Sequence, residues 1–177
     1  MGRVERAKRN MRENTKMQWE EKVIDLWNTK DSSLLGEVGE VVAWKYLWTQ
    51  GIKVWPFWRV VVEHLFTSEL TKGQTGFLEG YRSRAAATDK RTFDLVGICR
   101  RTGQPYLVEV KTTRSERYRY DSRKFPSVQQ RLEAKSLGFK LLLVIVQFMD
   151  NWRFRITCKE LKNRQALMHP TTLKEGG

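Results

Sequence analysis

Cysteine and histidine are too scarce in this sequence for a conventional zinc site or a disulfide framework. There are two of each in 177 residues, and the two cysteines, Cys99 and Cys158, lack the spacing of a metal-binding pair. Long apolar runs are missing too, because the longest, residues 141–146, is far shorter than the roughly 20 residues that cross a bilayer. The first residues are charged where a secretory signal is apolar. We therefore expect no membrane association, and a cytoplasmic protein with reduced thiols.

Acidic residues are few relative to basic ones. Thirty-three Lys and Arg against 20 Asp and Glu give a formal net charge of +13. Such a surplus favours a polyanionic partner, either nucleic acid or an anionic membrane surface. A protein that is merely soluble, or that sits in a ribosome-like environment without catalysis, is the alternative. At 40% hydrophobic and 11% aromatic residues, the chain has enough apolar material for a real core.

The length predicts one domain with extensions. We expect a basic helical N-terminal extension, a core and a polar C-terminal tail, over residues 1–30, 31–160 and 161–177 respectively. Helices are predicted from Asp31 to Gly51 and over residues 126–137, and a long loop, in which a helical turn could form, over residues 64–91. Strands are predicted at residues 52–55, 59–62, 92–99, 106–112, 141–148 and 152–157. Strands that alternate with helices indicate an α/β fold.

The first core helix carries two signals beyond its apolar residues. Asp31 should cap it, because a short acidic side chain accepts hydrogen bonds from the free N–H groups of the first turn. Apolar residues surround much of the helix, with Leu35, Val42 and Tyr46 at helical spacing, which predicts that it is well buried. Gly36 and Gly39 weaken a helix and therefore indicate close approach of a neighbouring backbone.

Three charged side chains meet if the strands on either side of RRTGQ form a hairpin. Side chains alternate along a strand, so Glu109 and Lys111 point to one face. With the turn centred on Thr102-Gly103, Asp94 lies opposite Lys111 on that same face. A slip of one residue in the pairing would remove this convergence. Alternating charges on an exposed strand face are the ordinary alternative.

Two converging carboxylates predict a metal site, because a divalent cation offsets their repulsion. Hard oxygen ligands suit Mg²⁺ or Mn²⁺, and the carbonyl of Val110 could add another oxygen. Such a metal activates water and stabilises charge that grows on a phosphate. Lys111 could orient the attacking water or neutralise the transition state. The set is complete for hydrolysis of a phosphodiester.

The motif D-x(14)-E-x-K on a hairpin, preceded by the helix sequence Gly39-Glu40-Val41-Val42-Ala43, resembles the PD-(D/E)xK nuclease superfamily. Within it, archaeal Holliday-junction resolvase-like endonucleases are the most similar. The resemblance covers about residues 33–148, although Phe93 replaces the usual proline before the aspartate. It implies a restriction-endonuclease-like core, in which a central mixed β-sheet is flanked by helices.

The resemblance also implies roles for individual residues. It makes Asp94, Glu109 and Glu40 metal ligands together with the Val110 carbonyl, and Lys111 the catalytic lysine. Glu37, one helical turn before Glu40, competes for its role, and an exposed or salt-bridged Glu40 is the structural alternative. Polar residues near the site in relatives correspond here to Gln129 or Gln130.

Basic and aromatic residues follow the Glu-x-Lys strand and suit a phosphate backbone with an occasional stacked base. The candidate nucleic-acid contacts are Arg114, Arg117, Tyr118, Arg119, Tyr120, Arg123 and Lys124. A solvated loop with locally packed tyrosines is the alternative. A second wall of the interface is predicted at Arg82, Arg84, Lys90 and Arg91.

We expect a metal-dependent DNA endonuclease that acts on branched DNA, because the chain is small and basic and has no module for reading a sequence. Cutting a symmetrical junction would require a homodimer, by analogy with relatives. Restriction or repair cleavage of linear or flap DNA is a close rival. A catalytically silent nucleic-acid-binding protein and an RNA-processing nuclease are the alternatives.

Overall fold

The computed structural model describes residues 30–88, 92–115, 126–149 and 153–161. Every element below lies in one compact unit, Asp31–Gly177. Several expectations fall outside the described residues: the N-terminal extension, most of the C-terminal tail, and two groups of candidate nucleic-acid contacts. These contacts are Lys90, Arg91, Arg117, Tyr118, Arg119, Tyr120, Arg123 and Lys124.

The centre of the fold is a five-stranded mixed sheet in the order β1-β2-β3-β4-β5. Its strands are β1 (Ile52–Pro56), β2 (Leu95–Cys99), β3 (Pro105–Thr113), β4 (Lys140–Met149) and β5 (Arg153–Glu160). β3 and β4 pair in parallel, and the other neighbours pair antiparallel. The prediction of an α/β fold with a mixed sheet is therefore confirmed.

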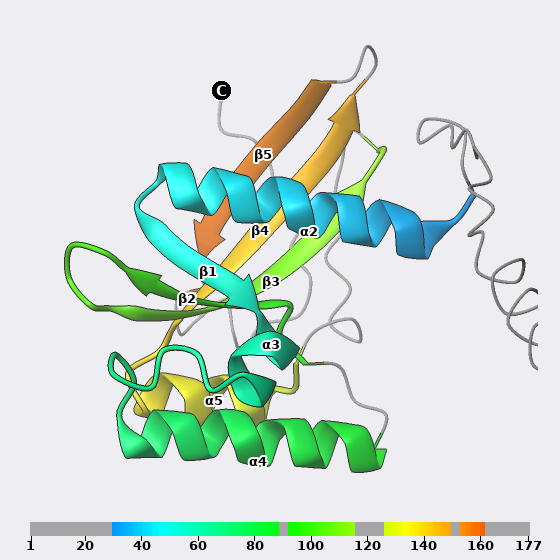
Figure 1. The fold of residues 1–177 in the computed structure, drawn as a ribbon. Helices are drawn as coiled ribbons and strands as arrows, with labels where there is room; N and C mark the ends of the chain where they lie inside the picture. Colours follow the sequence, from blue (N-terminus) through cyan, green and yellow to red (C-terminus); the bar gives the residue numbers. More distant parts are fainter. Residues whose placement is uncertain (1–29, 89–91, 116–125, 150–152, 162–177) are drawn as a thin grey trace, which may run out of the picture. The chain divides into compact units, whose positions relative to one another are not determined.

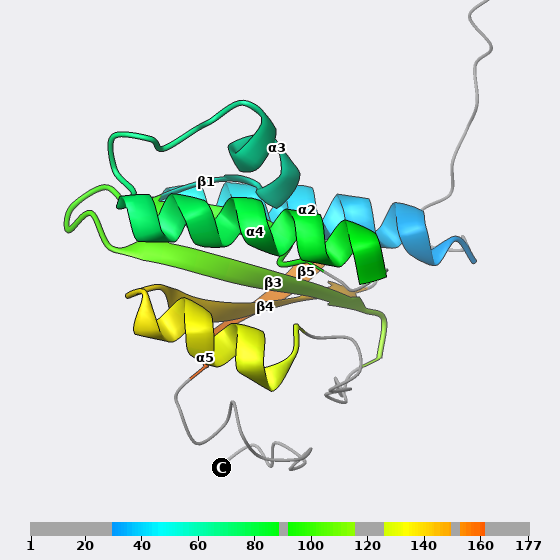
Figure 2. The ribbon, with the colours of Figure 1, turned by 90° about the horizontal axis from the view of Figure 1, so that it is seen from below.

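Within the described residues, four helices accompany the sheet. They are α2 (Ser32–Thr49), α3 (Phe57–Val62), α4 (Lys72–Thr88) and α5 (Val128–Ser136). Figures 1 and 2 place α2 and α5 on opposite sides of the sheet, with α4 along its lower end in Figure 1. α5 makes the crossover between the parallel strands β3 and β4, as parallel pairing requires. Sheet and helices thus form layers with apolar side chains between them.

The two faces of the sheet have different neighbours. On the face named here the α5 face, strand side chains join Ala134 of α5 and residues of α3 and α4 in one apolar core. These strand residues are Val96, Ile98, Leu107, Leu141, Leu143 and Ile145. On the other face, named the α2 face, Gly39 of α2 lies against Thr112 and Val146.

α2 begins and ends where the sequence predicts. Asp31 Oδ1 accepts hydrogen bonds from the nitrogens of Ser33, at 2.9 Å, and Leu34, at 3.2 Å. Gly51 follows the helix with φ +78°, a conformation that glycine adopts without steric cost. The helix is less buried than predicted, because its buried residues are Gly39, Ala43 and Leu47. The stripe of Leu35, Val42 and Tyr46 is only partly buried.

The two helix glycines differ in their surroundings. A Cβ added to Gly39 would lie 1.9 Å from Thr112 Cγ2, so this glycine lets α2 approach β3. The neighbour is a side chain rather than the backbone that we expected. A Cβ on Gly36 would meet nothing within 4 Å, so the prediction of close approach there is wrong.

Local signals predicted α5 and the hairpin correctly. Ser127 caps α5 through a capping box with Gln130, and Gly138 ends the following turn with φ +86°. The hairpin of β2 and β3 turns through residues 100–103, where Gly103 has φ +68°. These elements agree with the predicted ranges to within a few residues.

Two predictions in the middle of the chain are wrong. Residues 59–62 belong to α3 rather than to a strand, because Phe57, Val60 and Val61 bury one helical face despite the β-branched valines. Residues 64–91 contain α4 rather than only a loop. Its glycines suggested a loop, but Phe77, Leu78 and Tyr81 recur at helical spacing and enter the core. Tertiary burial therefore outweighs the poor helix propensity of this segment.

Candidate active site

The hairpin register differs from the expected one by two residues. Val96 pairs with Leu107 rather than with Glu109, and Leu95 pairs with Val108. The reason is a longer turn, in which Gly103 N donates to the Cys99 carbonyl at 2.9 Å. Side chains alternate with a period of two, so a shift of two residues changes partners without moving side chains to the other face.

Asp94 lies immediately before the first residue of β2. Its nitrogen donates to the Val108 carbonyl at 3.0 Å, and its carbonyl accepts from Phe57 N at 2.9 Å. Its side-chain Oδ2 accepts from Val110 N at 2.6 Å. Backbone N–H groups of a strand point along the sheet toward the neighbouring strand. The carboxylate of Asp94 therefore occupies the position beside β3 where the β2 ladder would have continued.

Glu109 and Lys111 form a buried pair on β3. In the parallel ladder Glu109 lies beside Leu143, and Lys111 beside Ile145, so both belong to the α5 face. Only 1% of Glu109 is exposed, and 13% of the Lys111 side chain. Lys111 Nζ donates to Glu109 Oε1. The alternative of alternating charges on a solvated strand face is therefore wrong.

Glu40 approaches the same point from α2. The pKa of its carboxyl is raised to about 7, chiefly by burial and then by the negative charges of Asp94 and Glu37, while the positive charge of Lys111 acts in the opposite direction. Glu40 is therefore within electrostatic range of both Asp94 and Lys111. Glu37 is exposed while Glu40 is partly buried, so of the two helix carboxylates Glu40 is the one turned toward the sheet.

Glu40 on the α2 face can interact with Asp94 and Lys111 because the sheet is incomplete beside them. Pairing between β2 and β3 stops at Val108, so β2 does not separate the two faces beside the rest of β3. α2 crosses in front of β3 and β4 (Figure 1). Gly39 contacts Thr112 of β3, and the adjacent Glu40 interacts electrostatically with Asp94, just before the start of β2. The site thus draws on α2, the start of β2 and the middle of β3.

The donor atoms suit a hard divalent cation. Mg²⁺ is commonly held by one or two carboxylates together with carbonyl and water oxygens, and Asp94, Glu109 and the Val110 carbonyl offer such a set. Within the described part of the chain, no group of three or more His, Cys, Asp or Glu side chains is arranged to hold a metal ion.

Other predicted residues take varied positions. Arg114 follows β3 and is exposed, as is Arg82 on α4. Gln130 serves the capping box, since its Oε1 accepts from Ser127 N at 2.8 Å, and Gln129 is exposed. We did not expect Arg131 to be buried. It lies on α5, three residues before the buried Ala134. Its helical spacing from Ala134 was the signal that could have placed it toward the sheet.

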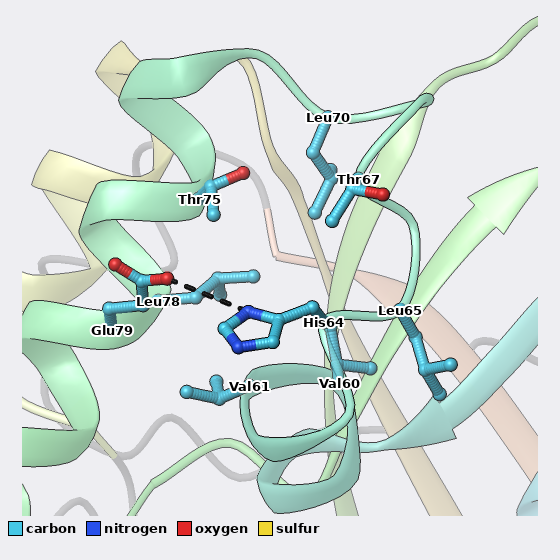
Figure 3. A pocket seen from close by; sticks show the side chains of 9 residues that line it. All are labelled: Val60, Val61, His64, Leu65, Thr67, Leu70, Thr75, Leu78 and Glu79. Atoms are coloured by element: carbon cyan, nitrogen blue, oxygen red, sulfur yellow. Dashed lines mark ion pairs between the residues drawn. The ribbon is translucent and has the colours of Figure 1, made fainter.

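A shallow hollow between α3 and α4 is a separate feature (Figure 3). It is lined mainly by apolar side chains and has room for no more than about one water molecule. His64 lies at it with Nδ1 4.0 Å from Glu79 Oε1. None of the candidate site residues lines it, so it has no part in the proposed chemistry.

Comparison with known proteins identifies no relative, so any functional assignment rests on the geometry of the site. Across the described residues, no helix is both long and apolar enough to cross a bilayer. No protein-family model, curated protein or solved structure matches the chain.

Proposed function

We propose that the chain is a metal-dependent endonuclease of the PD-(D/E)xK type that hydrolyses phosphodiester bonds in DNA. The observation that carries the proposal is the buried Glu109–Lys111 pair beside the carboxylate of Asp94. Burying charges inside a sheet costs free energy that apolar residues of similar size would not cost. A catalytic role gives a reason for their presence.

The order of elements supports the same proposal. The helix α2 precedes the hairpin of β2 and β3, and α5 and β4 follow it. This is the order of motifs on which the resemblance to the superfamily rests. We therefore propose that residues 31–160 form a restriction-endonuclease-like core.

In this proposal Asp94, Glu109 and the Val110 carbonyl hold the metal ion. When bound, a divalent ion offsets the repulsion between carboxylates and stabilises negative charge that develops on the phosphate. Lys111 donates hydrogen bonds to the phosphate or to the attacking water. Glu40, with a pKa of about 7, accepts a proton at neutral pH. The basic surplus of the chain holds the DNA backbone.

Cleavage of defined substrates tests the proposal. Labelled four-way junction, flap, linear duplex and single strand are incubated with Mg²⁺, Mn²⁺ or EDTA. We expect cleavage with either metal and none with EDTA. Glu109→Gln, which keeps the side-chain shape, should abolish it. Equal cleavage by this variant would contradict the assignment, because a contaminant or another site would then be responsible.

A catalytically silent nucleic-acid-binding protein is the second candidate. It is favoured by the hydrogen bonds that Asp94 and Glu109 make with protein donors. It predicts binding without cleavage in every metal. RNA strands in the same assay distinguish an RNA-processing nuclease.

Action on a symmetrical junction requires two active sites, so the proposal for branched DNA includes a homodimer. Analytical ultracentrifugation with and without junction DNA tests this part. A protein that stays monomeric on the junction would favour flap or linear substrates instead.

A further inference from the structure

Trp58 differs from the other tryptophans that the structure describes. Trp44 packs against Trp48 and Trp55, with ring centroids 6.2 and 5.8 Å away. Guanidinium groups cover the outer two rings, since Arg100 lies 4.5 Å over Trp48 and Arg59 lies 4.7 Å over Trp55. In the described ranges no such ring contact involves Trp58, and it is 60% exposed.

The helix that carries Trp58 is attached to the candidate active site. Phe57, the first residue of α3, donates its N–H to the Asp94 carbonyl at 2.9 Å. Consecutive Cα atoms are about 3.8 Å apart, so the Cα of Trp58 lies within roughly 8 Å of that carbonyl oxygen. The backbone position of Trp58 is thereby fixed relative to Asp94.

α3 also turns a second apolar side chain outward. Phe57, Val60 and Val61 are buried, whereas Val62 is 48% exposed. Val62 lies one helical turn after Trp58, so both belong to the same side of the helix. The ring and its aliphatic neighbour therefore form a small apolar area on the outer side of α3, in the helix that is hydrogen-bonded to the Asp94 carbonyl.

We propose that Trp58 is a stacking platform for an unpaired nucleobase next to the scissile phosphate. The inference rests on the proposed function and narrows its substrate class. Bases in continuous duplex already stack on one another, whereas bases at a branch, flap or single strand can stack on an aromatic ring. The enzyme therefore acts on nucleic acid that presents unstacked bases, rather than on uninterrupted duplex.

The net positive charge of the chain favours a nucleic acid, rather than a second protein, as the ligand of Trp58. A formal net charge of +13 disfavours a second copy of the chain and favours a polyanion. Arg59, whose side chain is 40% exposed, follows Trp58 in sequence, lies over the Trp55 ring and forms an ion pair with Glu63, with 2.7 Å between Nε and Oε1. An ion pair this exposed contributes little free energy, so a phosphate can compete with Glu63 for the guanidinium. A guanidinium beside an aromatic ring fits a nucleotide, because the base stacks while the phosphate meets the cation.

Binding of labelled DNA tests the inference without any cleavage. The full chain carrying Glu109→Gln is titrated in EDTA onto a flap, a single strand and a continuous duplex, with and without Trp58→Ala. We expect the loss of the ring to weaken binding to flap and single strand by about 5- to 150-fold. Duplex binding should be unchanged, and Trp58→Phe should retain most of the affinity for the flap.

Two controls distinguish the loss of the Trp58 ring from a nonspecific effect of removing an exposed apolar side chain. Val41→Ala removes a side chain that is also 60% exposed, but from α2, and should change no affinity. A 2-aminopurine base placed in the flap next to the branch should be quenched on binding, and Trp58→Ala should remove the quenching.

Several outcomes would overturn the inference. They are an unchanged flap affinity for Trp58→Ala, an equal loss on duplex, or a loss of self-association that assigns the surface to a second copy. If binding depends on Trp58 while no metal supports cleavage, the nuclease proposal fails and the stacking platform stands.

Discussion

The carboxylate of Asp94 accepts a hydrogen bond from the backbone N–H of Val110, with 2.6 Å between Oδ2 and the nitrogen. Val110 lies between Glu109 and Lys111, so this one bond ties the aspartate to the centre of the Glu-x-Lys motif. It also satisfies a strand N–H beyond the last β2–β3 pair. The bond therefore has a structural role that can be separated from any role in catalysis.

Substitutions at Asp94 should separate stability from activity. Asp94→Asn keeps an oxygen that can accept from Val110 N, whereas Asp94→Ala leaves that donor without its acceptor. We expect the alanine variant to lower the free energy of unfolding by about 1–3 kcal/mol relative to the asparagine variant. Both should lack nuclease activity, because both lose the charge. Urea denaturation measures the difference, and equal midpoints for the two variants would contradict it.

The buried pair should show strong coupling. Glu109→Leu leaves the Lys111 ammonium without its partner and should cost about 3–5 kcal/mol of stability. The double variant Glu109→Leu, Lys111→Met removes both charges and should recover much of that loss. A double-mutant cycle from urea denaturation gives the coupling free energy. Additive effects of the two substitutions would show that the charges do not interact in solution.

The pH dependence of stability should reveal Glu40. Its folded-state pKa of about 7 is above the ordinary 4.5, so the fold favours the neutral carboxyl. This contribution is fully present below pH 4.5 and is lost as the pH rises through about 7. Without metal, Glu40→Gln should therefore be the more stable protein at pH 8, by about 2–3 kcal/mol. At pH 4 the two proteins should have similar free energies of unfolding. A difference in stability that stays constant across pH would contradict the assignment.

Gly39 and Gly36 form a matched pair for testing how closely α2 packs against β3. Gly39→Ala places a Cβ 1.9 Å from Thr112 Cγ2 and should destabilise the protein by about 1–3 kcal/mol. Gly36→Ala meets nothing within 4 Å and should stabilise it by up to about 1 kcal/mol. Thr112→Ser removes the opposing methyl group and should rescue Gly39→Ala. Failure of that rescue would place the conflict elsewhere.

The basic segment after β3 should contribute to DNA affinity. Replacing Arg117 and Arg119 with alanine should weaken binding and flatten the salt dependence by about one unit per lost phosphate contact. Titrations at several salt concentrations give the slope. An unchanged slope would remove both residues from the interface.

The sequence predicted the elements that depend on local chemistry. Asp31, Ser127 and Gly138 begin or end helices through caps and a left-handed residue, and such signals need no knowledge of distant neighbours. α3 and α4 could not be predicted in this way, because their helical state depends on burial against the sheet.

The candidate site was predicted in part. Alternation along β3 correctly placed Glu109 and Lys111 on one face, but the pairing with β2 was wrong by two residues. The error came from the turn, whose length depends on the conformation around Gly103. The position of Asp94 beside Val110, and of Phe57 on the carbonyl of Asp94, results from tertiary hydrogen bonds that no local pattern encodes.

The parallel pairing of β3 with β4 determines when the charged pair acquires its environment. Leu143 and Ile145, which lie beside Glu109 and Lys111, come from the far side of the α5 crossover. In a nascent chain that ends before β4, both charged groups would still be hydrated. The dry surroundings that set the chemistry of this pair therefore arise only when the last interior strand joins the sheet, late in synthesis and after the hairpin itself can form.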